Sequence, residues 1–304
     1  MRNVLILFAL LGQIAFAQSI EVTSIQVLKG TETGGYYYPV FDPQGNYLLT
    51  TGENYAGLNL HSLISGEVKI LTADAGAGYR PSLSPDGKTI AYREVSYKDQ
   101  LRYVAVKSMD LSSPQTVAEE MAPSRNFSGM DLTSGTLKMA QGKKEVSKKI
   151  KNNASVGDRP LVISEDGLIV IYKNGVRTEL APNGKDKRYV RPSVSPDGTK
   201  LVYTMVIPTC TYVCDIDGEN PVALGYLNTP QWLGNHCIIG MTNKDDGHVV
   251  ISSSIDMVTI DGKTRQTLTP ASLKAMCPSV SADGKIVAFN TDKGEIYTMN
   301  INLK

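Results

Sequence analysis

The sequence is poor in the residues from which metal and nucleophilic sites are usually built. Its 304 residues include only three histidines, His61, His236 and His248. A metal site on this chain would need several converging histidines, and the C-x-x-C spacing typical of zinc sites is absent. No G-x-S-x-G elbow for a catalytic serine is present either. We therefore expect no metal, no cofactor and no catalytic residues.

The sequence also lacks an excess of charge of either sign. The formal net charge is +1, which gives no field that would attract nucleic acid or a membrane surface. Phenylalanine is scarce, with 5 residues, whereas the chain has 15 tyrosines and 27 glycines. A composition rich in tyrosine and glycine favours short β-strands joined by turns.

The longest apolar run lies at the very N-terminus. Arg2 precedes an apolar stretch over residues 4–15, and Ala15-Phe16-Ala17 fits a small-x-small cleavage site. The run is too short to span a bilayer, so we expect a cleavable signal peptide over residues 1–17 and no membrane span. The mature chain then begins at Gln18 in the periplasm or outside the cell.

Export would place the four cysteines in an oxidising compartment. Cys210 and Cys214 lie four residues apart, roughly 13 Å along one strand, which is too far for a disulfide between them. The sequence does not decide whether Cys237 and Cys277 form a disulfide. The favoured alternative is that all four cysteines are buried free thiols.

Four segments of the sequence align without gaps. Each reads Pro-x-x-x-(Pro/Ala)-(Asp/Gln)-Gly and is followed by an apolar strand; they are 39–45, 81–87, 192–198 and 278–284. The first proline suits a strand start, where its missing N–H does least harm. The second proline, the aspartate and the glycine favour a tight turn. Each segment therefore predicts a β-hairpin.

The spacing of these hairpins predicts the number of repeats. Pro39 to Pro81 is 42 residues, Pro81 to Pro192 is 111, and Pro192 to Pro278 is 86. With the 40–45 residue period typical of four-stranded blades, six repeats and an insertion account for the chain. This count treats Asp166-Gly167 as a later turn of the third repeat. If that turn begins a repeat of its own, there are seven.

A second series of turns supports four strands per repeat. These turns are Ser65-Gly66, Ser112-Ser113-Pro114, Asn174-Gly175, Asp217-Gly218 and Asp261-Gly262. The last repeat runs out of chain before its fourth strand. We expect a strand near residues 20–28 to complete it and to close a ring, so that residues 18–304 form one domain.

The motif Pro-x-x-Ser-Pro-Asp-Gly, best seen at residues 81–87 and 192–198, resembles the WD-like propeller repeat of TolB-type proteins. The resemblance covers nearly all of the mature chain and implies an all-β, six-bladed propeller of four-stranded antiparallel blades, with seven blades as the alternative. It also implies a binding protein of the bacterial cell envelope, with an envelope protein or peptide as partner, such as a lipoprotein or an OmpA-like domain. The separate N-terminal domain of TolB has no counterpart here.

Function in propellers usually lies at the mouth of the central channel, on the loops that enter the innermost strands. In this sequence those loops are rich in tyrosine and arginine, two types enriched at recognition sites. The candidate binding residues are Tyr37, Tyr38, Tyr79, Arg80, Arg188, Tyr189, Arg191 and Trp232. They predict a basic, aromatic funnel for a carboxylate-bearing partner, provided that Tyr38, Arg80 and Arg191 meet.

Two functions fit such a funnel. The favoured one is a non-enzymatic exported scaffold that binds a protein or peptide. The alternative is a carbohydrate-active lyase or hydrolase, or a module that binds acidic glycans, which converging carboxylates would favour. The basic segment 143–151 is interpreted as a solvated loop, with docking of an acidic partner as the less favoured reading.

Overall fold

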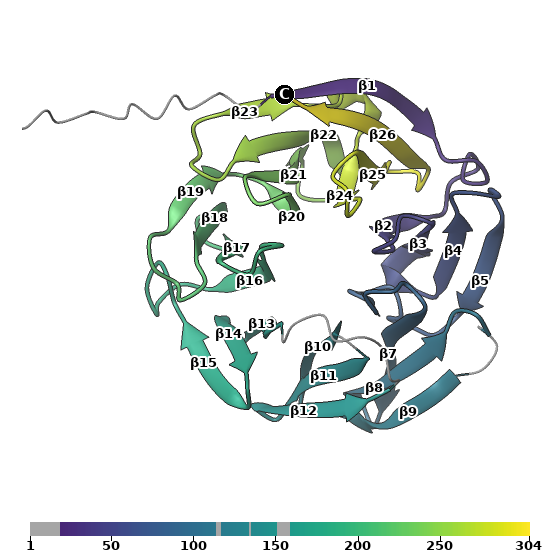
Figure 1. Cartoon of the computed structure of the whole chain (residues 1–304), viewed down its shortest axis with the longest axis vertical. Coiled ribbons are helices and arrows are strands. Elements are labelled where there is room, and N and C mark those ends of the chain that lie inside the picture. Colours follow the sequence, from purple (N-terminus) through teal and green to yellow (C-terminus); the bar gives the residue numbers. More distant parts are fainter. Residues whose placement is uncertain (1–18, 114–116, 134, 151–158) are drawn as a thin grey trace, which may run out of the picture.

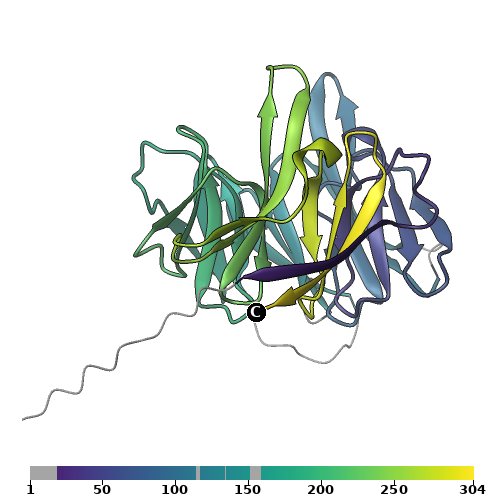
Figure 2. The same cartoon turned by 90° about the horizontal axis from the view of Figure 1, so that it is seen from above.

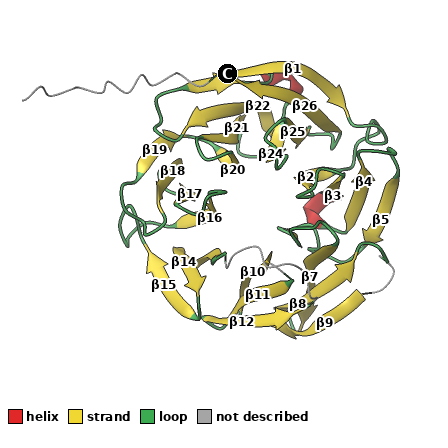
Figure 3. Cartoon of the chain, viewed as in Figure 1, coloured by secondary structure: helices red, strands yellow, loops and turns green. Residues whose placement is uncertain are grey.

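The computed structural model describes residues 19–113, 117–133, 135–150 and 159–304. The predicted signal peptide, and Pro114 of the turn at 112–114, lie outside the described residues. The chain forms antiparallel sheets that stand around a central axis like the blades of a propeller (Figure 1). Apart from two short 3-10 turns, η1 (Glu53–Tyr55) and η2 (Ala271–Leu273), all the regular structure in these described ranges is strand (Figure 3).

The ring has seven sheets, which we number in chain order. Blade 1 contains β2 (Tyr37–Phe41), β3 (Tyr47–Thr51), β4 (Leu58–Ser62) and β5 (Val68–Thr72). Blade 2 contains β6 (Ser82–Leu83), β7 (Thr89–Lys98), β8 (Leu101–Asp110) and β9 (Val117–Ser124). Blade 3 contains β10 (Phe127–Thr133), β11 (Thr136–Gln141) and β12 (Lys144–Lys149). Blade 4 contains β13 (Leu161–Glu165), β14 (Leu168–Lys173) and β15 (Val176–Leu180).

The remaining three blades have four strands each. Blade 5 contains β16 (Tyr189–Val194), β17 (Lys200–Met205), β18 (Cys210–Asp215) and β19 (Val222–Gly225). Blade 6 contains β20 (Asn228–Leu233), β21 (Cys237–Asp245), β22 (Val250–Thr259) and β23 (Arg265–Thr267). Blade 7 contains β24 (Met276–Val280), β25 (Ile286–Asn290), β26 (Ile296–Leu303) and β1 (Ile20–Val27).

The seven-blade alternative is thus confirmed, and the leading count of six is wrong. Blades 3 and 4 have three described strands each, so the 111 residues between Pro81 and Pro192 hold three blades rather than two blades and an insertion. The Asp166-Gly167 turn joins β13 to β14, the first two strands of blade 4, and is not a later turn of blade 3. The missing strands shorten the repeat, which is why a constant period gave the wrong number.

The innermost strand of blade 4, β13, runs in the opposite direction to the innermost strand of blade 5, β16. At its start, the Arg159 Nη2 donates to the Pro196 carbonyl beyond the end of β16, at 3.1 Å. Just after the end of β13, the Gly167 carbonyl accepts from the backbone N–H of Tyr189, the first residue of β16, at 2.7 Å. β13 and β16 are therefore antiparallel. Three strands in blade 3 leave the chain on the other face of the ring, and three strands in blade 4 return it.

The repeated turn is held by one side-chain arrangement. In blade 5 the Ser195 hydroxyl donates to Asp197 at 2.6 Å and accepts the N–H of Lys200 at 3.0 Å. The hydrogen bond from Ser195 is the main reason that the pKa of Asp197 is lowered. Blades 2 and 7 repeat this bond at Ser84–Asp86 and Ser281–Asp283. It fixes the hairpin in which each inner strand turns outward.

The N- and C-terminal strands meet in blade 7. β1 pairs with β26 in antiparallel fashion, with Ile20 opposite Leu303, and forms the outermost strand of that sheet (Figure 1). The Gln266 side chain of blade 6 accepts the N–H of Ile20 and donates to its carbonyl, at 2.8 and 2.6 Å. The two ends of the chain are thereby tied into one sheet and to the blade beside it.

The basic segment expected to be a solvated loop is a strand. Residues 144–149 form β12, which pairs with β11 and is the outer strand of blade 3. Lysines at Lys144, Lys148 and Lys149 suit this position, because charged side chains oppose pairing between an open sheet edge and another chain.

Two hairpins are longer than the others and rise from one face of the ring (Figure 2). They are β7–β8 and β21–β22, with strands of nine or ten residues against five or six in most other blades. Apolar side chains are exposed near their tips: Tyr97, Leu101, Val249 and Ile251. Within the described ranges, no helix is long and apolar enough to cross a membrane.

His61 on β4 makes blade 1 sensitive to acid. The ring is 1% exposed, its Nε2 lies 2.7 Å from the Thr50 hydroxyl, and burial lowers its pKa to about 4. Below its ordinary pKa of roughly 6.5 the unfolded chain takes up a proton that the folded chain refuses. Stability is therefore complete above that pH and falls as the pH drops towards 4, by up to ~3 kcal/mol.

We expect His61→Gln to reduce the loss of stability between about pH 7 and pH 4.5, because His61 takes up a proton in the unfolded chain over this range but stays neutral in the folded chain. The measurement is the urea midpoint at both pH values. His236→Gln serves as the control, since His236 is exposed. Equal pH slopes for the wild type and both variants would contradict the prediction.

Candidate functional site at the channel mouth

The five four-stranded blades share a strained residue at the start of the innermost strand. In each, the residue before the repeat proline has a left-handed backbone, with φ between 48° and 54°: Tyr38, Arg80, Arg191, Thr229 and Cys277. In four of the five the strand register breaks at this point. Non-glycine residues rarely adopt this conformation, which costs energy and is found most often at functional sites.

All five strained residues line one central cavity of about 280 Å³. The left-handed backbone places each of them in the wall, so five blades contribute to a single cavity. Neighbouring wall residues include Tyr55, Tyr79, Ser193 and Gln231. The described wall contains no aspartate, glutamate or histidine.

Tyrosines form one side of the cavity. Tyr38 stacks on Tyr55 with ring centroids 4.3 Å apart, and Tyr55 meets Tyr79 edge to face at 5.0 Å. The loop that carries Tyr79 is fixed by a backbone bond from the Gly78 N–H to the Tyr55 carbonyl, at 3.1 Å. Gly78 is required there, because a Cβ atom would lie 2.2 Å from the Thr51 side chain.

Two arginines also line the cavity. Arg80 and Arg191 are accessible to water within it, although the surrounding blades enclose Arg80 closely enough to lower its pKa by desolvation. Arg80 Nη2 donates to the Pro192 carbonyl at 3.3 Å. Among the described residues, neither guanidinium has a carboxylate within ion-pair distance, although the charge of Asp131 acts on Arg80 and opposes the lowering of its pKa. The described wall of the cavity thus carries two guanidinium groups and no carboxylate.

Two further hollows adjoin this cavity. One, of about 420 Å³, shares Tyr79, Arg80 and Arg191 with it and reaches the inner strands of blades 3 and 4. The other, of about 500 Å³, shares Tyr38 and Cys277 and is bounded by Tyr37, Met276 and the hairpin residue Val249. Together, the shared walls make one branched space at the axis of the ring.

The structure brings together half of the residues proposed from sequence. Tyr38, Tyr79, Arg80 and Arg191 line the central cavity, so Tyr38, Arg80 and Arg191 meet as the funnel hypothesis requires. Tyr37 lines the adjoining hollow, beside Tyr38. Burial, with Glu53 nearby, raises the pKa of Tyr37, so its hydroxyl remains a neutral donor.

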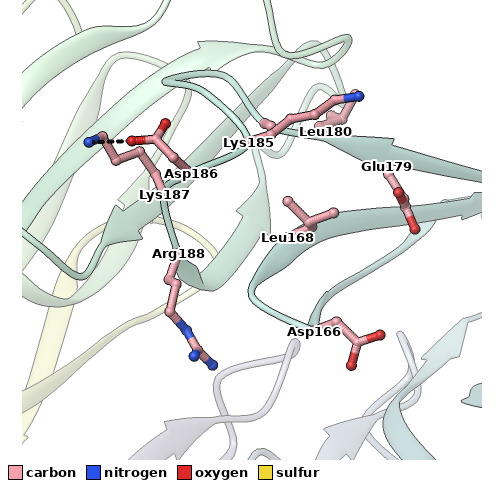
Figure 4. A pocket seen from close by; sticks show the side chains of 9 residues that line it. Asp166, Leu168, Glu179, Leu180, Lys185, Asp186, Lys187 and Arg188 are labelled. Atoms are coloured by element: carbon pink, nitrogen blue, oxygen red, sulfur yellow. Dashed lines mark ion pairs between the residues drawn. The ribbon is translucent and has the colours of Figure 1, made fainter.

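Three proposed residues lie elsewhere. Arg188 lines a separate surface pocket beside Leu168 and Glu179 (Figure 4). Tyr189 is fully buried in the core of blades 4 and 5, and its hydroxyl donates to the Gly184 carbonyl at 2.8 Å. Trp232 packs between blades 5 and 6 and donates from Nε1 to the Ser193 carbonyl at 3.3 Å. Tyr189 and Trp232 are held by packing contacts and take no part in the cavity wall.

The sequence analysis missed residues of these walls, and four of them bear on the site. Thr229 and Cys277 occupy the same position before the repeat proline as Arg80, and that shared position would have identified both. Tyr55 comes from the β3–β4 connection, whose contact with Tyr38 has no local sequence pattern. Arg93 lies within the long strand β7, where spacing alone does not distinguish it from a surface arginine.

The four cysteines are free thiols, so no disulfide contributes to the ring. Cys277 reaches the cavity, but desolvation raises the pKa of its thiol to about 12, even with Arg191 nearby. It is therefore protonated at neutral pH and is a poor nucleophile.

Thr229→Gly is expected to leave the stability unchanged or to raise it by up to ~1 kcal/mol, because glycine adopts a left-handed backbone without the strain that a β-branched residue suffers. Thr298→Gly, at a regular position in β26, is the control and should destabilise the fold. Urea denaturation of both variants tests this. Equal destabilisation by the two changes would show that Thr229 is not strained.

Comparison with known proteins shows a similarity of fold at low sequence identity. No family model and no curated protein matches the sequence. The WD40 repeats of RRP9 match with a TM-score of 0.65 at 10% identity, over 93% of this chain and 100% of theirs. U3-55K gives 0.65 at 11% identity with the same coverage. TolB from Acinetobacter baumannii gives 0.50 at 16% identity, over 86% of this chain and 55% of its own. The chain is a β-propeller, and its membership of the TolB-like family stays a prediction.

Proposed function

We propose that this chain is a non-enzymatic, exported binding protein that holds a carboxylate-bearing segment of a protein partner in its central cavity. One observation carries the proposal. Arg80 and Arg191 line the central cavity, and neither forms an ion pair with a carboxylate of the described residues. An incoming acid would supply the missing counter-charge.

The chemistry of the wall suits a carboxylate. A guanidinium presents a planar fork of donors that matches the two oxygens of a carboxylate. The surrounding tyrosines add large apolar faces and reduce competition from water, which strengthens a charged hydrogen bond. Such pairs of aromatic and arginine side chains are frequent anchors of protein interfaces.

The composition of the wall favours binding over catalysis. Neither the central cavity nor the hollow next to Arg93 has an aspartate, glutamate or histidine among its described lining residues. The hollow next to Tyr38 has one carboxylate, Asp292, which forms an ion pair with Lys274 at 2.8 Å. A lyase or hydrolase would need an acid or base at the reacting atom. The described residues also contain no cluster of histidine, cysteine and carboxylate side chains suited to a metal ion.

The expected partner is a protein of the cell envelope, because the N-terminal sequence predicts export. A lipoprotein or an OmpA-like domain is the class that the TolB resemblance implies. An acidic glycan is the alternative occupant, although Trp232 is packed between blades and so cannot stack on a sugar.

The test is a pull-down from envelope extract with the mature chain and with the Arg80→Ala/Arg191→Ala variant. We expect a partner that the wild type captures and the double variant loses, because the variant removes both donor forks from the cavity. Arg188→Ala is the matched control, since Arg188 lies outside the cavity and its variant should retain the partner. Capture by the double variant, or binding of acidic oligosaccharides in place of any protein, would overturn the proposal.

A further inference from the structure

Arg93 is a buried cation without a counter-ion. It lies on β7 and is 7% exposed. Its guanidinium carbon sits 4.8 Å from the centre of the Tyr79 ring and 5.0 Å from that of Phe127. Nε has no hydrogen-bond partner, and within the described residues Arg93 forms no ion pair. Two aromatic rings thus hold the group in position, and its Nε is left without a partner.

Arg93 is part of the wall of the 420 Å³ hollow. This hollow is also lined by Arg80 and Arg191, and by Ser128 and Ser164 from blades 3 and 4. Two acidic side chains of this region already have hydrogen-bond or ion-pair partners. Glu165, which accepts from Ser128, pairs with Arg177 at 2.6 Å, and Asp131 accepts from Ser82 at 2.8 Å. Asp131 keeps its charge, because a serine hydroxyl is neutral, but within the described residues neither carboxylate forms an ion pair with Arg93.

Stability does not explain this residue. A buried charge without a partner is costly, and an apolar side chain of similar volume at such a site is often neutral or stabilising. Desolvation lowers the pKa of Arg93 to about 10, so the group still carries its charge at neutral pH. An uncompensated cation held between two rings is the arrangement expected of a site that awaits an anion.

We propose that Arg93 forms a second anion subsite, and that the occupant is a peptide segment with two acidic groups, one at Arg80 and Arg191 and the other at Arg93. The inference rests on the proposed function and specifies its ligand. The two hollows share Tyr79, Arg80 and Arg191, so one ligand can span both.

A polypeptide fits the surroundings better than a sugar chain. The hairpin that carries Arg93 continues upward to Tyr97, which is 71% exposed. On the other long hairpin, Val249 and Ile251 are 62% and 56% exposed, and Val249 also lines the hollow next to Tyr38. These apolar side chains near the channel can contact apolar residues that flank the acidic pair.

The test is selection from a displayed library of random peptides with the mature wild-type chain and four variants. The wild type should enrich peptides with two acidic residues at a fixed spacing. Arg93→Met should enrich peptides that keep one acidic position and lose the other, and Arg93→Lys should select the two-acid class more weakly. Arg188→Met should match the wild type, whereas Arg80→Met/Arg191→Met should enrich nothing above background.

A binding measurement by fluorescence anisotropy follows with a selected peptide and with its single-acid version. Arg93→Met should weaken the two-acid peptide roughly tenfold or more and the single-acid peptide less than about twofold. Its melting temperature should be unchanged or higher, which separates lost binding from lost folding. Identical selections by the wild type and Arg93→Met would overturn the second subsite while leaving the proposed function intact. No acidic peptides enriched by the wild type would overturn both.

Discussion

Each blade of this ring has to deliver the chain to the face from which the next blade begins. Four antiparallel strands satisfy this constraint, because an even number of strands returns the chain to the face where it started. Blade 3 has three described strands, so blade 4 begins on the opposite face, as the contacts of Arg159 and Gly167 with blade 5 show. A second three-stranded blade restores the direction. The two irregular blades are therefore a matched pair: either alone would leave blade 5 facing the wrong way and would misplace Arg191.

The repetition of the four-stranded blade also creates the central cavity. The five four-stranded blades repeat the left-handed residue before their first proline, and these five residues all line the central cavity. Blades 3 and 4 have no left-handed residue at that position and contribute ordinary strand residues to the neighbouring hollow. The turn proline and the serine–aspartate bond hold the strands, while the residue before the proline is free to vary. Tyrosine, arginine, threonine and cysteine at this position suggest a rigid frame with exchangeable contacts.

Much of this could be predicted from local sequence. The Ser-x-Asp-Gly turns at Asp86, Asp197 and Asp283 encode their own hairpins through bonds within a few residues, and the repeat count failed only where strands are missing. The cavity residues Arg80 and Arg191 were identifiable because they adjoin those turns. Tyr189 and Trp232 were placed wrongly because an aromatic side chain near a loop can turn either to the axis or between blades. Arg93 could not be found, since only the packing of Tyr79 and Phe127 from two blades shows that its charge is buried.

The pairing of β1 with β26 has a consequence for how the fold is reached. Ile20 lies opposite Leu303, so this contact closes a loop of nearly the whole described chain, and loop closure of that length slows folding. A chain that emerges with its N-terminus first presents β1 long before its partner strand exists. Until β26 has been made, β1 has no described strand to pair with, and blade 7 lacks its outer edge. Closure of the ring thus depends on β26, and a chain that stops before this strand is left with an open sheet edge that proteases can recognise.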